Sequence, residues 1–165
     1  ALTSFLPLYL VVEKNLDPGA ASALYGLFFG IGIVVQPVAG RVADRYGYRL
    51  TLLLVTSILS VGLAALPSVH DVATLALLVV FMRIGHAGIA PITMSYLISA
   101  LPVSNQGSGF GIIRTIYLGI SALGATFVGV LADAGLFDEA FLALAGLTGV
   151  ALLLYTALPS QGTHS

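Results

Sequence analysis

The stretch Gly40-Arg41-Val42-Ala43-Asp44-Arg45-Tyr46-Gly47-Tyr48-Arg49 is a short polar segment in a chain that is otherwise strongly apolar. It carries three of the six Lys and Arg residues of the chain. Residues 20–39 before it and 50–66 after it are almost free of charge, and a helix needs roughly 20 such residues to cross a bilayer. Because Lys and Arg accumulate in short cytoplasmic loops, this pattern predicts a tight cytoplasmic hairpin between two membrane-spanning helices.

The composition of the whole chain indicates a membrane environment. Hydrophobic residues make up 58% of the 165 residues and charged residues 8%, whereas soluble domains average about 45–50% and about 25%. The mean hydropathy is +1.05. These values exclude an ordinary soluble domain, and a net charge of −1 gives no sign of nucleic-acid binding. The chain has no cysteine, so it offers neither a disulfide framework nor a thiolate metal site.

Proline, glycine and polar clusters divide the chain into six apolar segments. We expect an all-α, polytopic transmembrane helix bundle with five complete helices and one partial helix. The expected spans are 1–12, 20–39, 50–66, 72–100, 107–132 and 140–158. The first is too short to cross about 30 Å of hydrocarbon, so we interpret it as the second part of a helix, with a truncated gene as the alternative.

The charges in the loops predict the orientation of the bundle. The hairpin has three arginines, whereas the loops at the other end combine one lysine with most of the acidic residues: Glu13, Lys14, Asp17, Asp71, Asp133, Asp138 and Glu139. We therefore expect the hairpin and the C-terminal tail to face the cytoplasm. The localisation expected is multi-pass, in a prokaryotic cytoplasmic membrane.

Two of the expected helices carry small residues at every fourth position, which allows another helix backbone to come close. In 20–39 these residues are Ser22, Gly26 and Gly30. In 107–132 they are Gly107, Gly111, Thr115 and Gly119. We expect the second stripe to be the strongest close-packing face of the bundle.

The hairpin resembles the signature loop of the major facilitator superfamily of secondary transporters, G-x-x-(A/S)-D-(R/K)-x-G-(R/x)-(R/K). The matching residues are Gly40, Asp44, Arg45, Gly47 and Arg49. Tyr48 departs from the pattern, because the family often has a second basic residue there. The resemblance implies a gating role in which the loop locks one of the alternating conformations. The alternative is that the arginines only mark the cytoplasmic side.

Arg83 is the main candidate for a substrate or coupling site, because it lies about eleven residues into the span 72–100. A charge at this depth costs at least about 2.5–3.5 kcal/mol, so the side chain should face protein or a cavity. The stretch Met82–Gly88 resembles the superfamily's fourth-helix motif, a buried arginine followed by glycines, or its counterpart in the second half. This resemblance implies proton coupling, and a structural role is the alternative.

Three further polar residues complete the candidate set. His86 shares a helix face with Arg83, whose charge would hold it neutral and favour hydrogen bonding to a substrate over protonation; a packed core histidine is the alternative. Gln36 is polar at depth and should face protein or a cavity. Arg114 either binds an anion at the cytoplasmic gate or reaches the interface with its long side chain. Tyr25, Tyr96 and Tyr117 are weaker cavity candidates.

The sequence lacks the motifs of several other classes. There is no H-E-x-x-H zinc motif, no G-x-x-x-x-G-K-(S/T) phosphate loop and no G-x-S-G serine protease motif with a histidine in another span. We therefore expect that the protein is not an enzyme and that it binds neither a cofactor nor a metal.

The resemblance implies that residues 1–165 form one six-helix half-domain of such a transporter. The short, near-neutral tail and the ending Leu131-Ala132-Asp133-Ala134-Gly135 favour the C-terminal half. The implied function is alternating-access antiport or symport of a small molecule, with export of an amphipathic compound as one form. The expected partners are the substrate, a coupling proton or ion, the lipid bilayer and the missing six-helix half. The alternative is a non-transporting receptor or regulator with the same fold.

Overall fold

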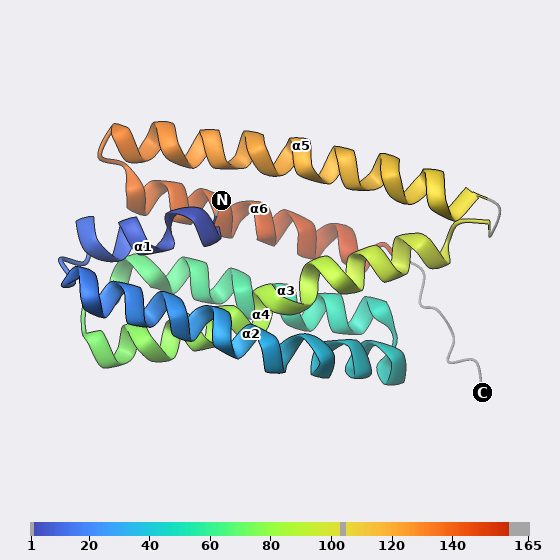
Figure 1. Ribbon diagram of the computed structural model, residues 1–165, viewed down its shortest axis with the longest axis horizontal. Coiled ribbons are helices and arrows are strands. Elements are labelled where there is room, and N and C mark those ends of the chain that lie inside the picture. Colours follow the sequence, from blue (N-terminus) through green and yellow to red (C-terminus); the bar gives the residue numbers. More distant parts are fainter. Residues whose placement is uncertain (1, 103–104, 159–165) are drawn as a thin grey trace.

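The computed structural model describes residues 2–102 and 105–158, and every regular element in these residues is helical. The helices are α1 (Leu2–Val12), α2 (Pro18–Tyr46), α3 (Tyr48–Ala65), η1 (Leu66–Ser68), α4 (Val72–Ser99), α5 (Gln106–Asp133) and α6 (Phe137–Thr156). They lie side by side in one elongated bundle (Figure 1). The C-terminal tail 159–165 and residues 103–104 of the loop between α4 and α5 lie outside the described residues.

Five of these helices are long and apolar enough to cross a membrane: α2, α3 with η1, α4, α5 and α6. Helix α1 has 11 residues, which at a rise of about 1.5 Å per residue is shorter than the bilayer core. A spanning segment must satisfy its backbone N–H and C=O groups internally, which a helix does. The predicted all-α transmembrane bundle is therefore confirmed.

Two aspartates start helices at the end of the bundle opposite the hairpin. The carboxylate of Asp17 accepts from the backbone nitrogens of Gly19 and Ala20, at 2.8 and 3.3 Å. The carboxylate of Asp71 accepts from the backbone nitrogen of Thr74 at 2.9 Å, and this hydrogen bond holds the pKa of Asp71 below its usual value. Such N-caps satisfy backbone donors that have no partner within the helix.

The hairpin is shorter than the sequence predicts. Helix α2 continues through Gly40 to Tyr46, and α3 begins at Tyr48, so Gly47 alone connects them. Gly47 has φ 88° and ψ 152°, a conformation that favours glycine. The predicted end of the helix at 39 is wrong because nothing in Arg-Val-Ala-Asp-Arg breaks a helix. Long arginine side chains can reach the interface from the last helical turns.

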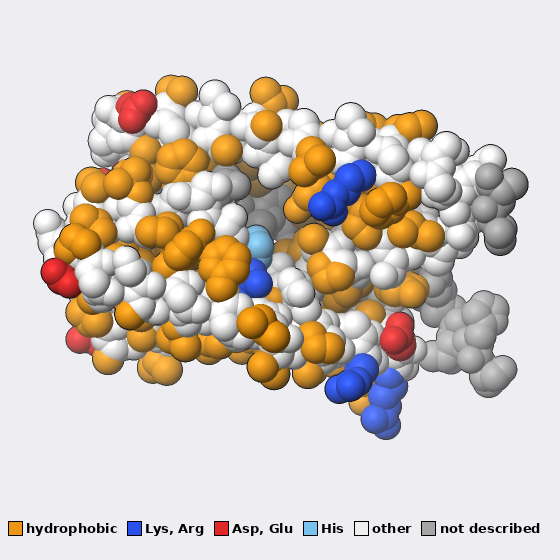
Figure 2. All heavy atoms as spheres, in the orientation of Figure 1, with side chains coloured by type: hydrophobic (Ala, Val, Ile, Leu, Met, Phe, Trp, Pro, Cys, Tyr) orange, Lys and Arg blue, Asp and Glu red, His pale blue; other side chains and the backbone are white. Residues whose placement is uncertain are grey.

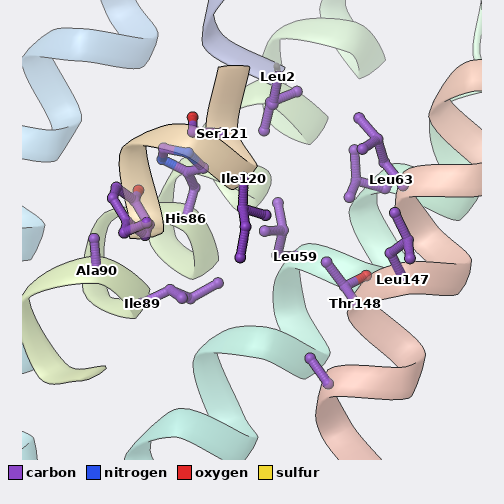
Figure 3. Close-up of a pocket in the computed structure, with 13 residues that line it drawn as sticks. Leu2, Leu59, Leu63, His86, Ile89, Ala90, Ile120, Ser121, Leu147 and Thr148 are labelled. Carbon is purple, nitrogen blue, oxygen red and sulfur yellow. The ribbon is translucent and has the colours of Figure 1, made fainter. Parts of the chain in front are cut away.

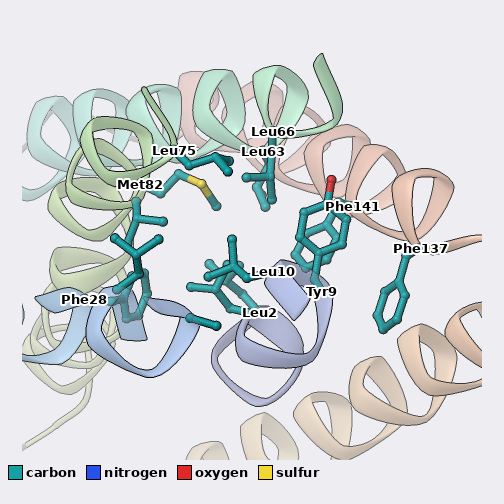
Figure 4. Close-up of a cluster of buried hydrophobic side chains, with 14 of the residues drawn as sticks. Leu2, Tyr9, Leu10, Phe28, Leu63, Leu66, Leu75, Met82, Phe137 and Phe141 are labelled. Carbon is teal, nitrogen blue, oxygen red and sulfur yellow. The ribbon is translucent and has the colours of Figure 1, made fainter. Parts of the chain in front are cut away.

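Helix α4 packs against both α2 and α3, and α3 packs in turn against α6. The core between them is apolar and includes side chains from α1 as well (Figure 4). Its largest fully buried members are Leu6, Tyr9, Leu10, Phe28, Leu63, Leu66, Leu75, Met82 and Phe141. This cluster holds the first and last helices to the α3–α4 pair.

The close-packing contacts lie on α3 and α4. A Cβ atom on Gly85 would stand 2.5 Å from the carbonyl oxygen of Val55 and 2.6 Å from the nitrogen of Leu59. The side chain of Met82 occupies the space beside Gly62 in the same way. By contrast, nothing lies within 4 Å of a Cβ on Gly107, Gly111 or Gly119. Among the described residues, the prediction that 107–132 carries the strongest close-packing face is therefore wrong.

Polar contacts join the helices at both ends of the bundle. The hydroxyl of Tyr9 donates to Asp138 at 2.6 Å, which ties α1 to α6. The ammonium of Lys14 donates to the carbonyl oxygen of Pro67 at 2.6 Å. At the opposite end, Nη2 of Arg49 donates to the carbonyl oxygen of Thr156 at 2.6 Å, which ties α3 to the last turn of α6. A cation at a helix C-terminus is also favoured by the helix dipole.

We expect Gly85→Ala to destabilise the bundle, because the new methyl group would meet the backbone of α3. Overpacking of this kind costs about 1–3 kcal/mol. Thermal unfolding of the full-length protein in detergent should show a melting temperature lower by several degrees. Gly119→Ala is the matched control, since its methyl group meets nothing within 4 Å. Equal melting temperatures for the two variants would contradict the packing described above.

Candidate functional site

Arg83 lies between α4 and α2, with only 7% of its surface exposed. Its guanidinium carbon is 4.8 Å from the ring centre of Phe28 and 5.4 Å from that of Phe29. Gly32, one turn further along α2, leaves room for the guanidinium, because a Cβ atom at this position would overlap with it. The cation is thus stabilised by aromatic rings instead of a carboxylate.

Arg83 and His86 are in direct contact. Nη1 of Arg83 lies 3.0 Å from Nδ1 of His86. A guanidinium can only donate, so Nδ1 must accept and the hydrogen of the imidazole is on Nε2. His86 is therefore a neutral imidazole in this arrangement, with Nε2–H as its one donor.

The charge of Arg83 has no acidic partner at its depth. Arg83 is the twelfth residue of the 28-residue α4, close to the middle of the bundle. All seven acidic residues of the chain lie at or next to helix ends. Nε of Arg83 is buried and has no hydrogen-bond partner among the described residues. An unpaired buried charge is costly and is rarely kept without a use.

A cavity of about 480 Å³ opens beside His86. Figure 2 shows a hollow near the middle of one face, in which a histidine and a basic side chain are visible among apolar ones. Figure 3 shows His86 and Ser121 on one side of the pocket and Leu147 and Thr148 of α6 on the other. The remaining lining is mostly apolar and comes from α1, α3, α4, α5 and α6: Leu2, Leu59, Leu63, Ile89, Ala90, Tyr117, Ile120, Leu144 and Ala151.

Gln36 and Arg114, the other two predicted candidates, lie apart from this site. Gln36 is exposed on α2 and Arg114 is exposed on α5, and neither lines the cavity beside His86. Within the described residues no helix covers Gln36, so its expected contact with protein or a cavity remains a prediction.

Of the three tyrosines, only Tyr117 lines the cavity. Tyr25 donates to the carbonyl oxygen of Thr3 at 2.9 Å and so fixes α2 to α1. Tyr96 packs edge-on against Tyr48 at the opposite end, with ring centres 6.0 Å apart. These two are therefore packing residues in this structure.

The five matching residues of the hairpin occupy one end of the bundle. Gly40 and Asp44 line a small hollow of about 50 Å³ together with Tyr48, Pro91 and Ser95. Asp44 is exposed at the last turn of α2. Arg45 lies over the ring of its neighbour Tyr46, at 5.4 Å, and Gly47 forms the turn. Arg49 donates to the carbonyl of Thr156, which leaves Asp44 available to a partner outside these helices.

Sequence reasoning missed the residues of α2 that surround Arg83. Phe28, Phe29 and Gly32 contact the guanidinium, yet they are about 50 positions away in the sequence. The signal was the run Phe28-Phe29-Gly30-Ile31-Gly32, which offers aromatic rings and a gap on neighbouring turns. Only the register of α2 against α4 shows that these features meet Arg83.

The arrangement can bind and orient a ligand. In residues 2–102 and 105–158 there is no group of three His, Cys, Asp or Glu residues that could hold a metal ion. A guanidinium and an imidazole N–H next to an apolar cavity supply hydrogen-bond donors to a small molecule.

Comparison with known proteins identifies one family and several relatives that are similar to this chain. The model of the family described as Major Facilitator Superfamily matches residues 1–164. The riboflavin transporter RibZ of Clostridioides difficile is 28% identical over 130 residues, which covers 77% of this chain and 28% of that protein. A homologue of the multi-drug resistance efflux pump PmrA from Lactococcus lactis is 28% identical over 159 residues, or 91% of this chain and 38% of that protein.

A third relative is the MFS-type transporter gkaD of Penicillium citrinum, 27% identical over 165 residues, covering 93% of this chain and 28% of that protein. No solved structure gives a significant match. The matches thus cover between 28% and 38% of the length of these relatives.

We expect Phe28 and Arg83 to be energetically coupled. Phe28→Leu keeps an apolar side chain but removes the ring 4.8 Å from the guanidinium, and a desolvated cation–π contact is worth about 2 kcal/mol. Melting temperatures of the wild type, Phe28→Leu, Arg83→Met and the double variant form a double-mutant cycle. The loss caused by Phe28→Leu should be smaller when Arg83 is already replaced. Additive losses would show that the ring stabilises the bundle by packing alone.

Proposed function

Since the chain belongs to the major facilitator superfamily and is an integral, multi-pass membrane protein, we propose that it is one half of a secondary transporter. The protein carries a small molecule across the membrane by alternating access, in which two six-helix halves rock around a site near the bilayer midplane. The names of the relatives, two transporters and an efflux pump, support transport rather than an enzymatic reaction.

The observation that carries this proposal is the unpaired, buried Arg83 at mid-depth. A charge inside the bilayer is expensive and typically marks a substrate or ion pathway. Arg83 contacts His86, and His86 lines a cavity of about 480 Å³. We assign Arg83 and His86 to the substrate site. Gln36 and Arg114 are left out of it, because neither is among the residues that line this cavity.

The hairpin acts as a latch at the cytoplasmic end. Gly40 and Asp44 face a small hollow, and the exposed carboxylate of Asp44 can accept from the start of a helix in the other half, where the dipole favours an anion. Gly47 shapes the turn and Arg49 fixes α3 to α6, so both act by holding the latch in position. The Arg-rich end and the tail that follows α6 lie in the cytoplasm.

The largely apolar cavity lining supports an amphipathic substrate, and export is the direction favoured, with a multi-drug efflux pump among the relatives. Energy comes from a proton or ion gradient. The described helices carry no carboxylate at mid-depth, so a titrating acid for proton coupling would come from the other half of the transporter.

A receptor or regulator on the same fold is the second candidate function. It would bind a ligand in the same cavity without moving it. Flux separates the two, because only a transporter accumulates its substrate against a gradient.

We expect the full-length protein in proteoliposomes to accumulate at least one compound from a panel of riboflavin and amphipathic fluorescent dyes under an imposed proton gradient. Asp44→Asn should lower the rate about tenfold while ligand binding is kept, because a gate contact of about 1.4 kcal/mol is lost. Asp71→Asn is the matched control, since asparagine caps a helix about as well as aspartate. Arg83→Ala should lose uptake and binding together.

Wild-type rates in both Asp44→Asn and Arg83→Ala would contradict these two assignments. A folded wild type that binds a dye yet moves none of the panel would favour the receptor.

A further inference from the structure

We propose that the substrate of this site is an organic monoanion, whose carboxylate binds Arg83 and His86 and whose apolar body fills the cavity beside His86. The inference rests on the proposed transport function and adds the charge and shape of the compound. It follows from three features of the site: the unpaired charge of Arg83, the hydrogen-bond donors that the Arg83–His86 pair offers without an acceptor, and the apolar lining of the cavity.

The first feature is the single unpaired charge. Arg83 is the one buried arginine of the described helices. Arg114 is exposed on α5, Arg41, Arg45 and Arg49 lie at the hairpin, and Lys14 lies at the opposite end. No carboxylate of the described helices lies at this depth, so these helices contribute a positive charge to their side of the cavity. One charge is best matched by one negative charge, because a dianion would leave an uncompensated charge in an apolar environment.

The second feature is the way the guanidinium is held. Phe28 and Phe29 lie over it, at 4.8 and 5.4 Å from their ring centres. The two rings are inclined at 73° to each other, and neither supplies a carboxylate or carbonyl oxygen to the N–H groups of the guanidinium. Nε is buried without a partner among the described residues. The edge formed by Nε and Nη2 packs against Gly32, so a ligand carboxylate would accept from an Nη N–H group through a charge-assisted hydrogen bond.

His86 strengthens the preference of the site for a carboxylate. Its only acceptor, Nδ1, already receives the hydrogen bond from Arg83, so only Nε2–H remains for a ligand. The Arg83–His86 pair therefore offers donors and no acceptor. An ammonium group would find only repulsion there, and a neutral amide would place its own N–H groups against other donors. A carboxylate, which only accepts, satisfies both residues.

The third feature is the cavity wall. Leu59, Leu63, Ile89 and Leu147 supply an apolar lining for the body of the ligand. Ser121 and Thr148 add hydroxyl groups at its edge. A volume of about 480 Å³ falls in the usual range for small-molecule sites, about 300–1,000 Å³. The site thus fits a compact aromatic or aliphatic acid.

Three probes with one apolar body and different head groups test this inference: 2-naphthoate, 2-naphthamide and 2-naphthylmethylammonium. Binding is measured by probe fluorescence on the full-length protein in nanodiscs of zwitterionic phosphatidylcholine, so that anionic lipid headgroups do not compete. We expect the wild type to bind naphthoate at least about tenfold more tightly than the amide, and the ammonium compound least, because specificity is the difference between the affinities.

Substitutions at Arg83 and His86 then test whether these two residues bind the head group of the probe. Arg83→Gln should weaken naphthoate binding by at least about tenfold, since the loss of one partner of a buried charge pair exceeds 1.4 kcal/mol. Arg83→Lys should recover part of the affinity, because the charge returns without the planar fork. His86→Phe should weaken naphthoate while leaving the amide unchanged. Arg41→Gln is the matched control, because it removes an exposed arginine at the hairpin and should leave all three affinities unchanged.

Each outcome decides between the alternatives. If the wild type binds the amide or the ammonium compound as tightly as naphthoate, or binds none of them, the anion inference is overturned, whether or not the Arg83 variants fold. Uptake of a neutral or cationic dye from the panel would still leave the transport proposal standing. Conversely, selective naphthoate binding without flux of any compound would support the anion site and overturn transport.

Discussion

Helix α4 approaches α3 so closely that a methyl group on Gly85 would meet the α3 backbone. The bundle depends on this contact, because α4 is the helix that also packs against α2. The same approach brings Arg83 against Phe28, Phe29 and Gly32. Glycines on α2, α3 and α4 thus set the distances at which a buried arginine meets aromatic rings instead of lipid.

The fold could be predicted because its signals are local. Runs of apolar residues, turn residues such as Asp17-Pro18-Gly19, and the arginines of the hairpin each act within about one helix length. The ends of helices were harder to predict, as the stretch from Gly40 to Tyr46 demonstrates. A charged residue does not stop a helix whose end reaches water. The close-packing face was misplaced, since glycine spacing in a sequence does not reveal which helix stands opposite.

The candidate site was predictable only in part. The depth of Arg83 and its spacing from His86 follow from helix geometry, and the structure brings the two side chains together. Their environment does not follow, because Phe28 and Gly32 lie on another helix and the cavity lining comes from five helices. The absence of an acid near Arg83 could be read from the sequence, since every Asp and Glu stands near the end of a helix. What this absence implies for ligand binding could be inferred only from the structure around the guanidinium of Arg83.

Gly47 is the single residue between α2 and α3, and it restricts how these two helices can move relative to each other. With one residue there is no slack, so the two helices cannot slide past each other without changing the backbone at Gly47. Arg49 couples α3 to the last carbonyl groups of α6. Gly47 and Arg49 thus join α2, α3 and α6 at this end of the bundle. Helix α5, in which only Val128 is buried among the described residues, takes no part in either of these two connections.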